Sequence, residues 1–276
     1  MVIFSSLLAA TLVAPTVSIS EPCKPIPGWN KVVSDKKIRW IVLGEMHGTN
    51  EMPEIFADAV CLTAEVSPTV VALELPEIDQ PRIDAYLESD GGPKAKQAFF
   101  EAYIWNSRAK DGRSSEAVFR LFEQLHRWHK VGKVRAVIAF QPVRLKEPST
   151  SAEYERAMAD IIEKNTPKEF RALVLVGNVH AMRTKVDFGP EPYLPMAGHL
   201  PRRNTLSLDI FSNGVSSAWA CRGQGQCGET TFGRKGDEFA RGLILNKKSN
   251  ERYDGQLFLG SVTTASVPQT TAIPSP

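Results

Sequence analysis

The sequence predicts an α/β fold with a mixed, largely parallel central sheet flanked by helices and built from two pseudo-repeated halves. Apolar runs typical of buried strands alternate with amphipathic stretches of helical period. Two of the apolar runs also end in the same short pattern. A chain of 276 residues that is 42% hydrophobic is long enough for one large domain with a well-buried core. We expect that domain to span residues 21–262.

The first two strands define the parallel arrangement. Residues Ile38–Leu43 form an apolar run that ends at Gly44, and residues Thr69–Leu75 form a second run that ends at Pro76. The segment Pro53–Thr63 between them has a helical pattern. A strand, a helix and a strand in this order pair the two strands in parallel.

The remaining elements continue the alternation. A helix begins at Ile83 and is broken by residues 91–93, and Ser114 or Ser115 caps a long amphipathic helix that ends near Val131. We then expect a strand at 134–140, a helix at 151–165, a strand at 170–176, and later, antiparallel strands at 205–211 and 256–262. Residues 263–276 are rich in Thr, Ser and Pro and are predicted to form a flexible tail.

Charge and the N-terminal composition narrow the class of protein. A formal net charge of +2 with no basic block excludes a typical nucleic-acid-binding protein. Residues 1–20 carry no charged side chain, and their apolar stretch Leu7–Ala14 is too short to span a bilayer. We therefore predict a secretory signal peptide at 1–20 and a periplasmic or secreted protein with no transmembrane segment, the alternative being a buried N-terminal helix.

The four cysteines fit an oxidising compartment. Cys221 and Cys227 flank a short Gly-rich segment in which a disulfide would close a small ring. Cys23 and Cys61 remain as the second pair, which is one of the three connectivities that four cysteines allow. Buried free thiols are the alternative.

The repeated pattern places two histidines at strand ends. Residues 39–47 and 171–180 both read as an arginine, an apolar strand and Gly-x-x-His, which ends in His47 and His180. The two copies lie about half the chain apart, which is the basis for predicting two related halves. Because ligands bind beyond the carboxyl ends of parallel strands, we expect both histidines in one crevice.

Two carboxylates accompany these histidines. Glu45 stands two residues before His47, and Glu74 lies in the otherwise apolar run 69–75. A buried carboxylate needs a partner, and an imidazole or a metal ion would serve. Two imidazoles with one or two carboxylates match catalytic divalent-metal sites, whereas one imidazole beside a carboxylate matches a general base. Histidines that only cap strand ends are the structural alternative.

These motifs carry a resemblance to a known superfamily. Gly44–His47, Glu74, Asp111–Ser114, Gly177–His180, Tyr253–Gly255 and Thr264–Ser266 resemble segments of the superfamily that includes the Tiki Wnt-processing metalloproteases, the ChaN-like haem-binding uptake proteins and the erythromycin esterases. The Tiki branch implies a divalent metal ion held by His47 and His180, with Glu45 and Glu74 less firmly placed. The esterase branch implies a histidine base without metal, and the ChaN-like branch implies bound haem.

The other candidates are less specific. Arg113, in the matched Asp111–Ser114 stretch, could bind a substrate carboxylate or stabilise an oxyanion, or form a structural ion pair. His126 and His129 are expected at a solvated helix end, His199 in a Pro-rich loop, and Arg183 is a weaker candidate.

The function expected from these residues is an exported, divalent-metal-dependent hydrolase of an ester or amide bond, with water activated in the His/Glu crevice. His47, Glu45, Glu74, His180 and Arg113 are the predicted catalytic residues, His47, His180 and Glu74 the metal ligands, and a small molecule or peptide the substrate. The alternative is a periplasmic protein that binds haem or another ligand without catalysis. The sequence leaves open whether the chain is an enzyme.

Overall fold

The structure, a computed structural model, describes residues 22–108, 110–143, 149–222, 226–246 and 251–271. The predicted signal peptide at 1–20 lies outside these ranges. Within them, every helix is too short or too polar to span a bilayer.

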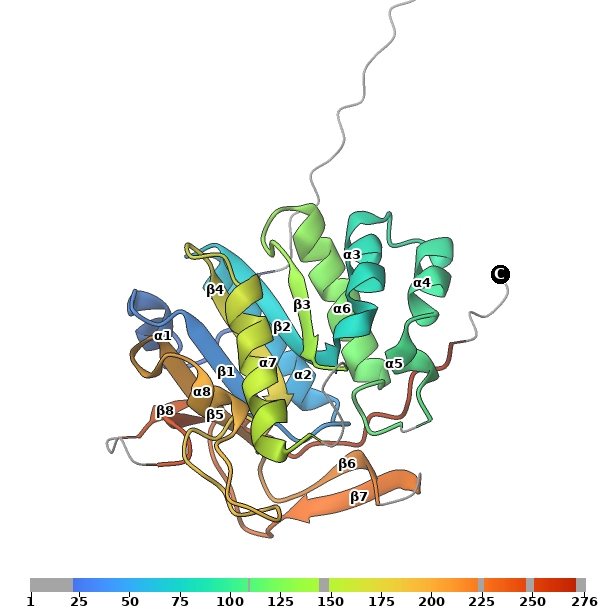
Figure 1. Ribbon diagram of the computed structural model, residues 1–276. Helices are drawn as coiled ribbons and strands as arrows, with labels where there is room; N and C mark the ends of the chain where they lie inside the picture. Colours follow the sequence, from blue (N-terminus) through green and yellow to red (C-terminus); the bar gives the residue numbers. More distant parts are fainter. Residues whose placement is uncertain (1–21, 109, 144–148, 223–225, 247–250, 272–276) are drawn as a thin grey trace, which may run out of the picture.

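The centre of the molecule is a mixed, mostly parallel sheet of seven strands in the order β3-β2-β4-β1-β5-β9-β8 (Figure 1). The first six of these strands pair in parallel, and only β8 runs antiparallel to its neighbour β9. The strands are β1 (Trp40–Glu45), β2 (Thr69–Pro76), β3 (Val137–Gln141), β4 (Arg171–Gly177), β5 (Thr205–Phe211), β8 (Gly242–Leu245) and β9 (Gly255–Phe258). The predicted fold class is confirmed.

Two expectations about the sheet need correction. The strands predicted at 205–211 and 256–262 are not antiparallel, because β5 pairs in parallel with β1 and β9 in parallel with β5. Alternating burial shows that a strand has one covered face, but it does not encode the direction of the strand. The two pseudo-repeated halves are not shown either: β1 and β4, which carry the repeated pattern, lie side by side at the centre of one sheet.

Helices cover both faces of the sheet (Figure 1). Ile41 and Leu43 of β1 face a large apolar cluster that includes Phe56 of α2 and Phe122 of α6. Val42, between them, faces the opposite side, where Met158 of α7 packs. The helices are α1 (Asn30–Ser34), α2 (Glu51–Ala64), α3 (Gln80–Glu88), α4 (Pro93–Phe100), α5 (Tyr103–Asn106), α6 (Glu116–Lys130), α7 (Ser151–Asn165) and α8 (Met196–His199), with 3-10 turns at Glu77–Asp79 and Arg202–Asn204.

The two longest described helices, α6 and α7, begin at side-chain caps. The Ser115 hydroxyl accepts a hydrogen bond from the Val118 amide, which confirms one of the two predicted caps of α6. At α7, Thr150 and Glu153 form a reciprocal capping box. Each cap fixes the residue at which its helix begins.

A separate hairpin lies beyond the carboxyl ends of the parallel strands (Figure 1). It consists of β6 (Val215–Cys221) and the antiparallel β7 (Cys227–Gly233). The Gly48 carbonyl accepts hydrogen bonds from the amides of Trp219, in β6, and of Ser266, each at 2.8 Å. The hairpin is therefore joined directly to the residue that follows His47.

The first residues of the predicted tail are packed rather than loose. Thr263 and Ser266 are each 2% exposed, and Thr264 accepts a backbone hydrogen bond from Asn50 at the start of α2. Bridges Thr49–Ala265 and Ser115–Pro268 add to these contacts. The segment fills the space between the starts of α2 and α6, which composition alone does not reveal.

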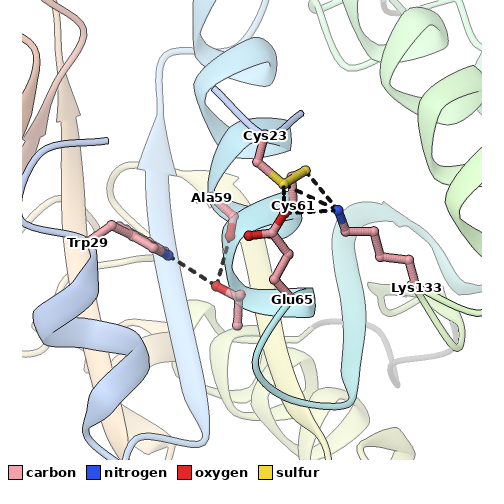
Figure 2. The surroundings of a disulfide bond; sticks show 7 residues. Cys23, Trp29, Ala59, Cys61, Glu65 and Lys133 are labelled. Carbon is pink, nitrogen blue, oxygen red and sulfur yellow. Dashed lines mark hydrogen bonds and ion pairs between the residues drawn. A yellow bond between two sulfur atoms is a disulfide. The ribbon is translucent and has the colours of Figure 1, made fainter. Parts of the chain in front are cut away.

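Both predicted disulfides are present. Cys221 and Cys227 join the two strands of the hairpin, and Cys23 and Cys61 join the N-terminal segment to α2. Beside the second bond, the Lys133 ammonium lies 3.2 Å from Cys23 Sγ and 3.1 Å from Cys61 Sγ (Figure 2). Among the described residues no cysteine is free. The two bonds fit the predicted oxidising compartment.

Candidate functional site

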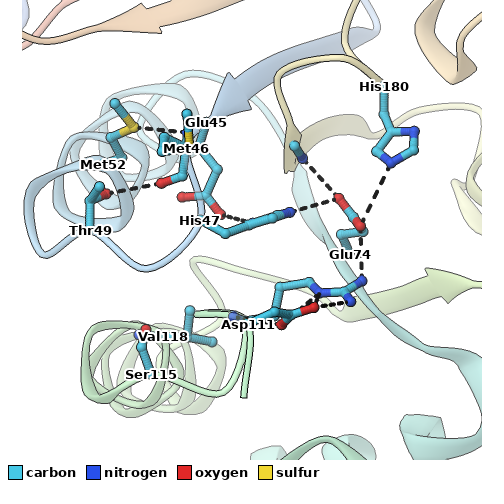
Figure 3. Close-up of polar contacts among 12 residues, drawn as sticks. Glu45, Met46, His47, Thr49, Met52, Glu74, Asp111, Ser115, Val118 and His180 are labelled. Carbon is cyan, nitrogen blue, oxygen red and sulfur yellow. Dashed lines mark hydrogen bonds and ion pairs between the residues drawn. The ribbon is translucent and has the colours of Figure 1, made fainter. Parts of the chain in front are cut away.

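Three adjacent strands bring the predicted side chains together at one edge of the sheet (Figure 3). Glu45 ends β1, Glu74 lies near the end of β2, and His180 follows β4 by three residues. Strand β4 lies between β2 and β1. Because β1 pairs with β4 so that Glu45 is opposite Gly177, the two Gly-x-x-His turns leave the sheet at the same level. The crevice predicted from the repeated pattern is therefore where these side chains meet.

His47 lies between two carboxylates. Its Nδ1 is 2.9 Å from Glu45 Oε1, and its Nε2 is 3.3 Å from Glu74 Oε2. Burial alone would lower the pKa of His47, but the charge of Glu74 and the hydrogen bonds to both carboxylates outweigh burial and raise that pKa to about 10. His47 is therefore an imidazolium at neutral pH, with both ring nitrogens acting as donors.

Glu74 is the centre of the cluster. Its Oε2 accepts a hydrogen bond from the Gly177 amide at 2.8 Å, and its Oε1 accepts one from Arg113 Nη1 at 3.0 Å. Burial opposes ionisation of this carboxyl group, but the neighbouring charges of His47, His180 and Arg113 prevail and lower its pKa. Glu74 is thus a carboxylate whose oxygens are already engaged by donors.

A glycine is needed at the end of β4. A Cβ at Gly177 would lie 3.0 Å from His47 Nε2 and 3.5 Å from Glu74 Oε2. Any side chain at this position would intrude between the imidazolium and the carboxylate. The glycine of the second repeated pattern therefore serves the contact between the first pattern and β2.

Arg113 enters the site from the loop before α6. Its Nε lies 3.2 and 3.1 Å from the two carboxylate oxygens of Asp111, and its Nη2 also contacts Asp111. Burial would lower the pKa of Arg113, but Asp111 and Glu74 raise it. Arg113 was predicted either to bind substrate or to form an ion pair. In the structure it forms ion pairs, and it retains N–H groups beyond those used.

The loop of Arg113 and the turn after His47 are packed without spare room. A Cβ on Gly48 would lie 2.1 Å from the Trp219 carbonyl oxygen, and one on Gly112 would lie 2.4 Å from the Gly48 amide nitrogen. Both glycines have positive φ, at +78° and +91°. Three chain segments thus fix the backbone beside His47.

His180 has a different environment from His47. Its Nδ1 is 2.7 Å from Glu155 Oε1, whereas its Nε2 is 3.9 Å from Glu74 Oε1, which is beyond hydrogen-bond distance. Burial lowers the pKa of His180, but the hydrogen bond to Glu155 and the charge of Glu74 raise it overall. His180 therefore has one bonded nitrogen and one that is open to a ligand.

Glu155 was not among the predicted residues. It lies on α7 and is 2% exposed, and its other oxygen accepts a hydrogen bond from the Met196 amide at 2.7 Å. A signal was present in the sequence, because Glu155 shares the apolar face of that helix with Met158, Ala159 and Ile162. A carboxylate on an otherwise apolar helix face indicates a buried polar partner.

A small cavity lies behind His47. Its volume is about 20 Å³, and its polar lining comes from Glu45, His47, Glu74 and Arg113. That volume is sufficient for one water molecule. Glu45 Oε2 is buried and has no hydrogen-bond partner in the protein, and burial raises the pKa of Glu45 despite the bond to His47. One water at this position would complete the environment of Glu45.

The remaining candidates have structural contacts elsewhere. His126, expected in solvent, is 8% exposed and contacts the Ser89 carbonyl at 3.0 Å, so that expectation is wrong. His129 contacts the Val134 carbonyl at 3.1 Å and Glu88 at 3.0 Å. Both histidines lie against residues at the end of α3, which helical spacing alone cannot reveal. His199 contacts Arg156, and Arg183 binds Asp254 and the Thr205 and Arg202 carbonyls.

A divalent metal ion does not fit the predicted ligands as they lie. Both nitrogens of His47 and both oxygens of Glu74 are engaged, and the permanent charge of Arg113 stands where it would repel a cation. In the described part of the chain, only Cys23, Cys61 and Glu65 place three ligand atoms within 4.8 Å of one another. Both sulfurs there are in a disulfide, so neither is a thiolate ligand.

Haem binding would require a histidine nitrogen that is free to bind the iron as an axial ligand. An axial histidine needs an unbonded nitrogen, which His47 lacks and His180 Nε2 supplies. The cavity beside His47 holds only about 20 Å³, so haem would have to lie on the open side of His180. A larger open groove, of about 540 Å³, is lined by residues 213–214, 236–240 and 261–262 and includes none of these side chains.

Comparison with solved structures identifies similar folds. A succinoglycan biosynthesis protein matches with a TM-score of 0.59 and 10% identity, covering 87% of this chain and 91% of the other. A mutant of the erythromycin esterase EreC in its open conformation matches with a TM-score of 0.54 and 14% identity, covering 88% and 94%. ChaN of Campylobacter jejuni, solved with cofacial haem, matches with a TM-score of 0.43 and 12% identity, covering 66% and 84%.

Sequence comparison gives no further match. No family model and no curated protein matches this chain. The resemblance to the superfamily of erythromycin esterases and ChaN-like proteins was inferred from short motifs, and at the level of the fold it is matched by the erythromycin esterase structure. At these identities the likeness concerns the fold, so the chemistry has to be argued from the side chains.

Proposed function

We propose that the protein hydrolyses an ester or amide bond in a small molecule or peptide, with His180 as the proton acceptor and without a metal ion. The observation that supports this proposal is the convergence of two imidazoles, an arginine and buried carboxylates at the carboxyl ends of β1, β2 and β4. Such a cluster holds charges of both signs in fixed positions, which is what acyl-transfer chemistry requires.

His180 is the residue suited to move a proton. Its Nδ1 donates to Glu155, so in the neutral ring the lone pair is on Nε2. The side chain is 25% exposed, which lets water and substrate reach that nitrogen. We infer that His180 Nε2 accepts a proton from the attacking water and then returns it to the leaving group.

His47 and Arg113 have an electrostatic role in the proposal. His47 donates from both nitrogens to carboxylates, so its ring has no lone pair to act as a base at neutral pH. With Arg113 it holds Glu74 ionised and supplies positive charge beside His180. The N–H groups of Arg113 that the ion pairs leave over would stabilise the oxyanion that forms on the substrate carbonyl.

Substrate class and location complete the proposal. The similar fold of an erythromycin esterase makes esters the first substrates to test. The two disulfides support export to the periplasm or the exterior, where a small molecule or peptide would be met. Haem binding stays a second prediction, and a Soret band on reconstitution, lost in His180→Ala, would show it.

The test is hydrolysis of an ester and amide panel by the purified full-length chain. We expect His180→Ala to lower kcat about 100-fold or more, because general acid-base catalysis typically contributes at least that factor. His129→Ala is the matched control, since His129 contacts a carboxylate and a carbonyl far from the crevice in the fold. Equal rates for His180→Ala and the wild type on every hydrolysed substrate would overturn the assignment.

A further inference from the structure

Glu155 is a carboxyl group buried beside an apolar cluster, where an ionised side chain destabilises the fold unless it is hydrogen-bonded. The residue lies on the face of α7 that packs into an apolar cluster, and it is 2% exposed. An ionised carboxyl group in such a place is destabilising unless every oxygen is hydrogen-bonded. Both oxygens of Glu155 are bonded, one to His180 Nδ1 and one to the Met196 amide, each at 2.7 Å.

The two partners of Glu155 have different roles. Met196 is the first residue of α8, so its amide belongs to the backbone and fixes one carboxylate oxygen whatever His180 does. A second backbone bond, from the Ala197 amide to the His180 carbonyl at 2.9 Å, joins the same helix to the histidine. The carboxylate is thus held by α8 through one oxygen and binds the imidazole through the other.

We propose that Glu155 is the positioning residue of His180: it holds the ring with the proton on Nδ1 and keeps Nε2 directed toward Glu74 Oε1, the oxygen that Arg113 also binds. This inference rests on the proposed function and adds a residue to it. A carboxylate behind a histidine fixes the tautomer and orientation of the ring without touching substrate. Glu155 differs from Glu45, which contacts a histidine whose other nitrogen is also bonded to a carboxylate.

The variant Glu155→Gln tests this inference sharply. The Met196 amide needs an acceptor, so the new side chain must turn its carbonyl oxygen toward Met196 and its NH₂ group toward His180 Nδ1. An NH₂ donor at that position favours the opposite tautomer, with the proton on Nε2. We expect kcat to fall about 100-fold or more, with KM changed less than about threefold.

Three readouts separate positioning from a structural role. We expect the acid limb of the kcat/KM profile to move to lower pH in Glu155→Gln, because the imidazolium loses its carboxylate. Glu155→Asp should recover part of kcat. Glu153→Gln is the matched control on the same helix: it weakens the capping box with Thr150 and should lower thermal stability without moving the acid limb.

A measurement independent of activity distinguishes failure of this inference from failure of the proposed function. Nitrogen-15 NMR of the imidazoles reports the tautomer of His180 directly. The proposal expects the proton on Nδ1 in the wild type and on Nε2 in Glu155→Gln. An unchanged tautomer, or an unchanged acid limb where hydrolysis is measured, would overturn it. Absence of hydrolysis together with the expected tautomers would refute only the proposed function.

Discussion

The two histidines follow the same Gly-x-x-His pattern on neighbouring strands, yet their surroundings assign them different chemistry. His47 has a carboxylate at each ring nitrogen, at 2.9 and 3.3 Å. His180 has one carboxylate at 2.7 Å, and its other nitrogen is 3.9 Å from the nearest carboxylate oxygen. The first is held as a cation, whereas the second can gain and lose a proton in the crevice.

The Gly-x-x-His pattern therefore places a histidine at the end of a strand, but it does not determine the role of that histidine. The role depends on neighbours that come from elsewhere in the chain: Glu74 from β2 for His47, and Glu155 from α7 for His180. If the two roles differ, variants at the two histidines should differ in kcat, in stability and in their dependence on pH.

Replacing each histidine by glutamine should separate the two roles. We expect His180→Gln to lower kcat about 100- to 10,000-fold, because the group that transfers protons is lost, and to cost less stability than His47→Gln, because only Glu155 loses its imidazole partner. We expect His47→Gln to lower kcat as well, but also to cost about 3 kcal/mol of stability, because buried Glu45 and Glu74 lose their common partner. Steady-state kinetics and thermal unfolding measure both. Equal loss of stability in the two variants would contradict the contrast.

Enlarging the glycine between the two histidines should have an intermediate effect. The Cβ of Gly177→Ala would lie 3.0 Å from His47 Nε2, so the imidazolium and Glu74 must move apart. We expect a loss of about 1–3 kcal/mol in stability and about 10-fold or more in kcat. Gly228→Ala is a matched control, since a Cβ there meets nothing within 4 Å. A variant at 177 as stable and active as this control would show that the contact is not needed.

The dependence on pH should distinguish the two rings. The pKa of His47 is raised to about 10, so its contribution to stability is complete below about pH 6.5 and is lost as pH rises through 10. The pKa of His180 is raised above its ordinary value of 6.5. Because the proposed base is the neutral ring, kcat/KM should rise with pH on the acid side of its profile. The melting temperature, measured by thermal unfolding between pH 6 and 10, should depend less on pH in His47→Gln than in the wild type. A melting temperature that rises between pH 7 and 10 would contradict the assignment of His47.

Removal of metal should have the smallest effect. The proposal uses Arg113 and His47 as the fixed positive charges, so a chelator should leave kcat and the melting temperature within error of the untreated protein. Elemental analysis of the purified protein gives the second measurement. Loss of activity with chelator, and its return with a divalent ion, would restore the metal site predicted at His47, His180 and Glu74.

The sequence predicted those features that depend on local pattern. The apolar runs of β1, β2 and β4 and the caps of α6 follow from side chains that are neighbours in the chain. The direction of β5 and β9 could not be predicted, because it is set by the crossovers and not by the strand residues. The hairpin β6–β7 was missed, since its strands alternate mostly between intermediate and exposed residues and bury little apolar surface.

In the site, too, the sequence predicted the residues that stand out locally and missed those whose role depends on tertiary packing. Glu45, Glu74 and both histidines were predicted because each stands out against an apolar strand or a repeated turn. Glu155 stood out on its helix as well, but its partner His180 lies 25 positions along the chain and is brought to it only by the packing of α7 and α8 on the sheet. Arg113 was predicted with two alternative roles, and only the distance to Glu74 shows that it forms the ion pair.

The bonds to Gly48 tie the turn after His47 to residues that lie far along the chain. The Gly48 carbonyl is held by amides of Trp219 and Ser266, which leave the ribosome long after His47 and Glu74. A nascent chain that has reached only β2 contains Glu45, His47 and Glu74 but lacks the backbone that holds the turn at Gly48. We therefore expect the turn beside His47 to be fixed only after the segment that contains Ser266 has been made.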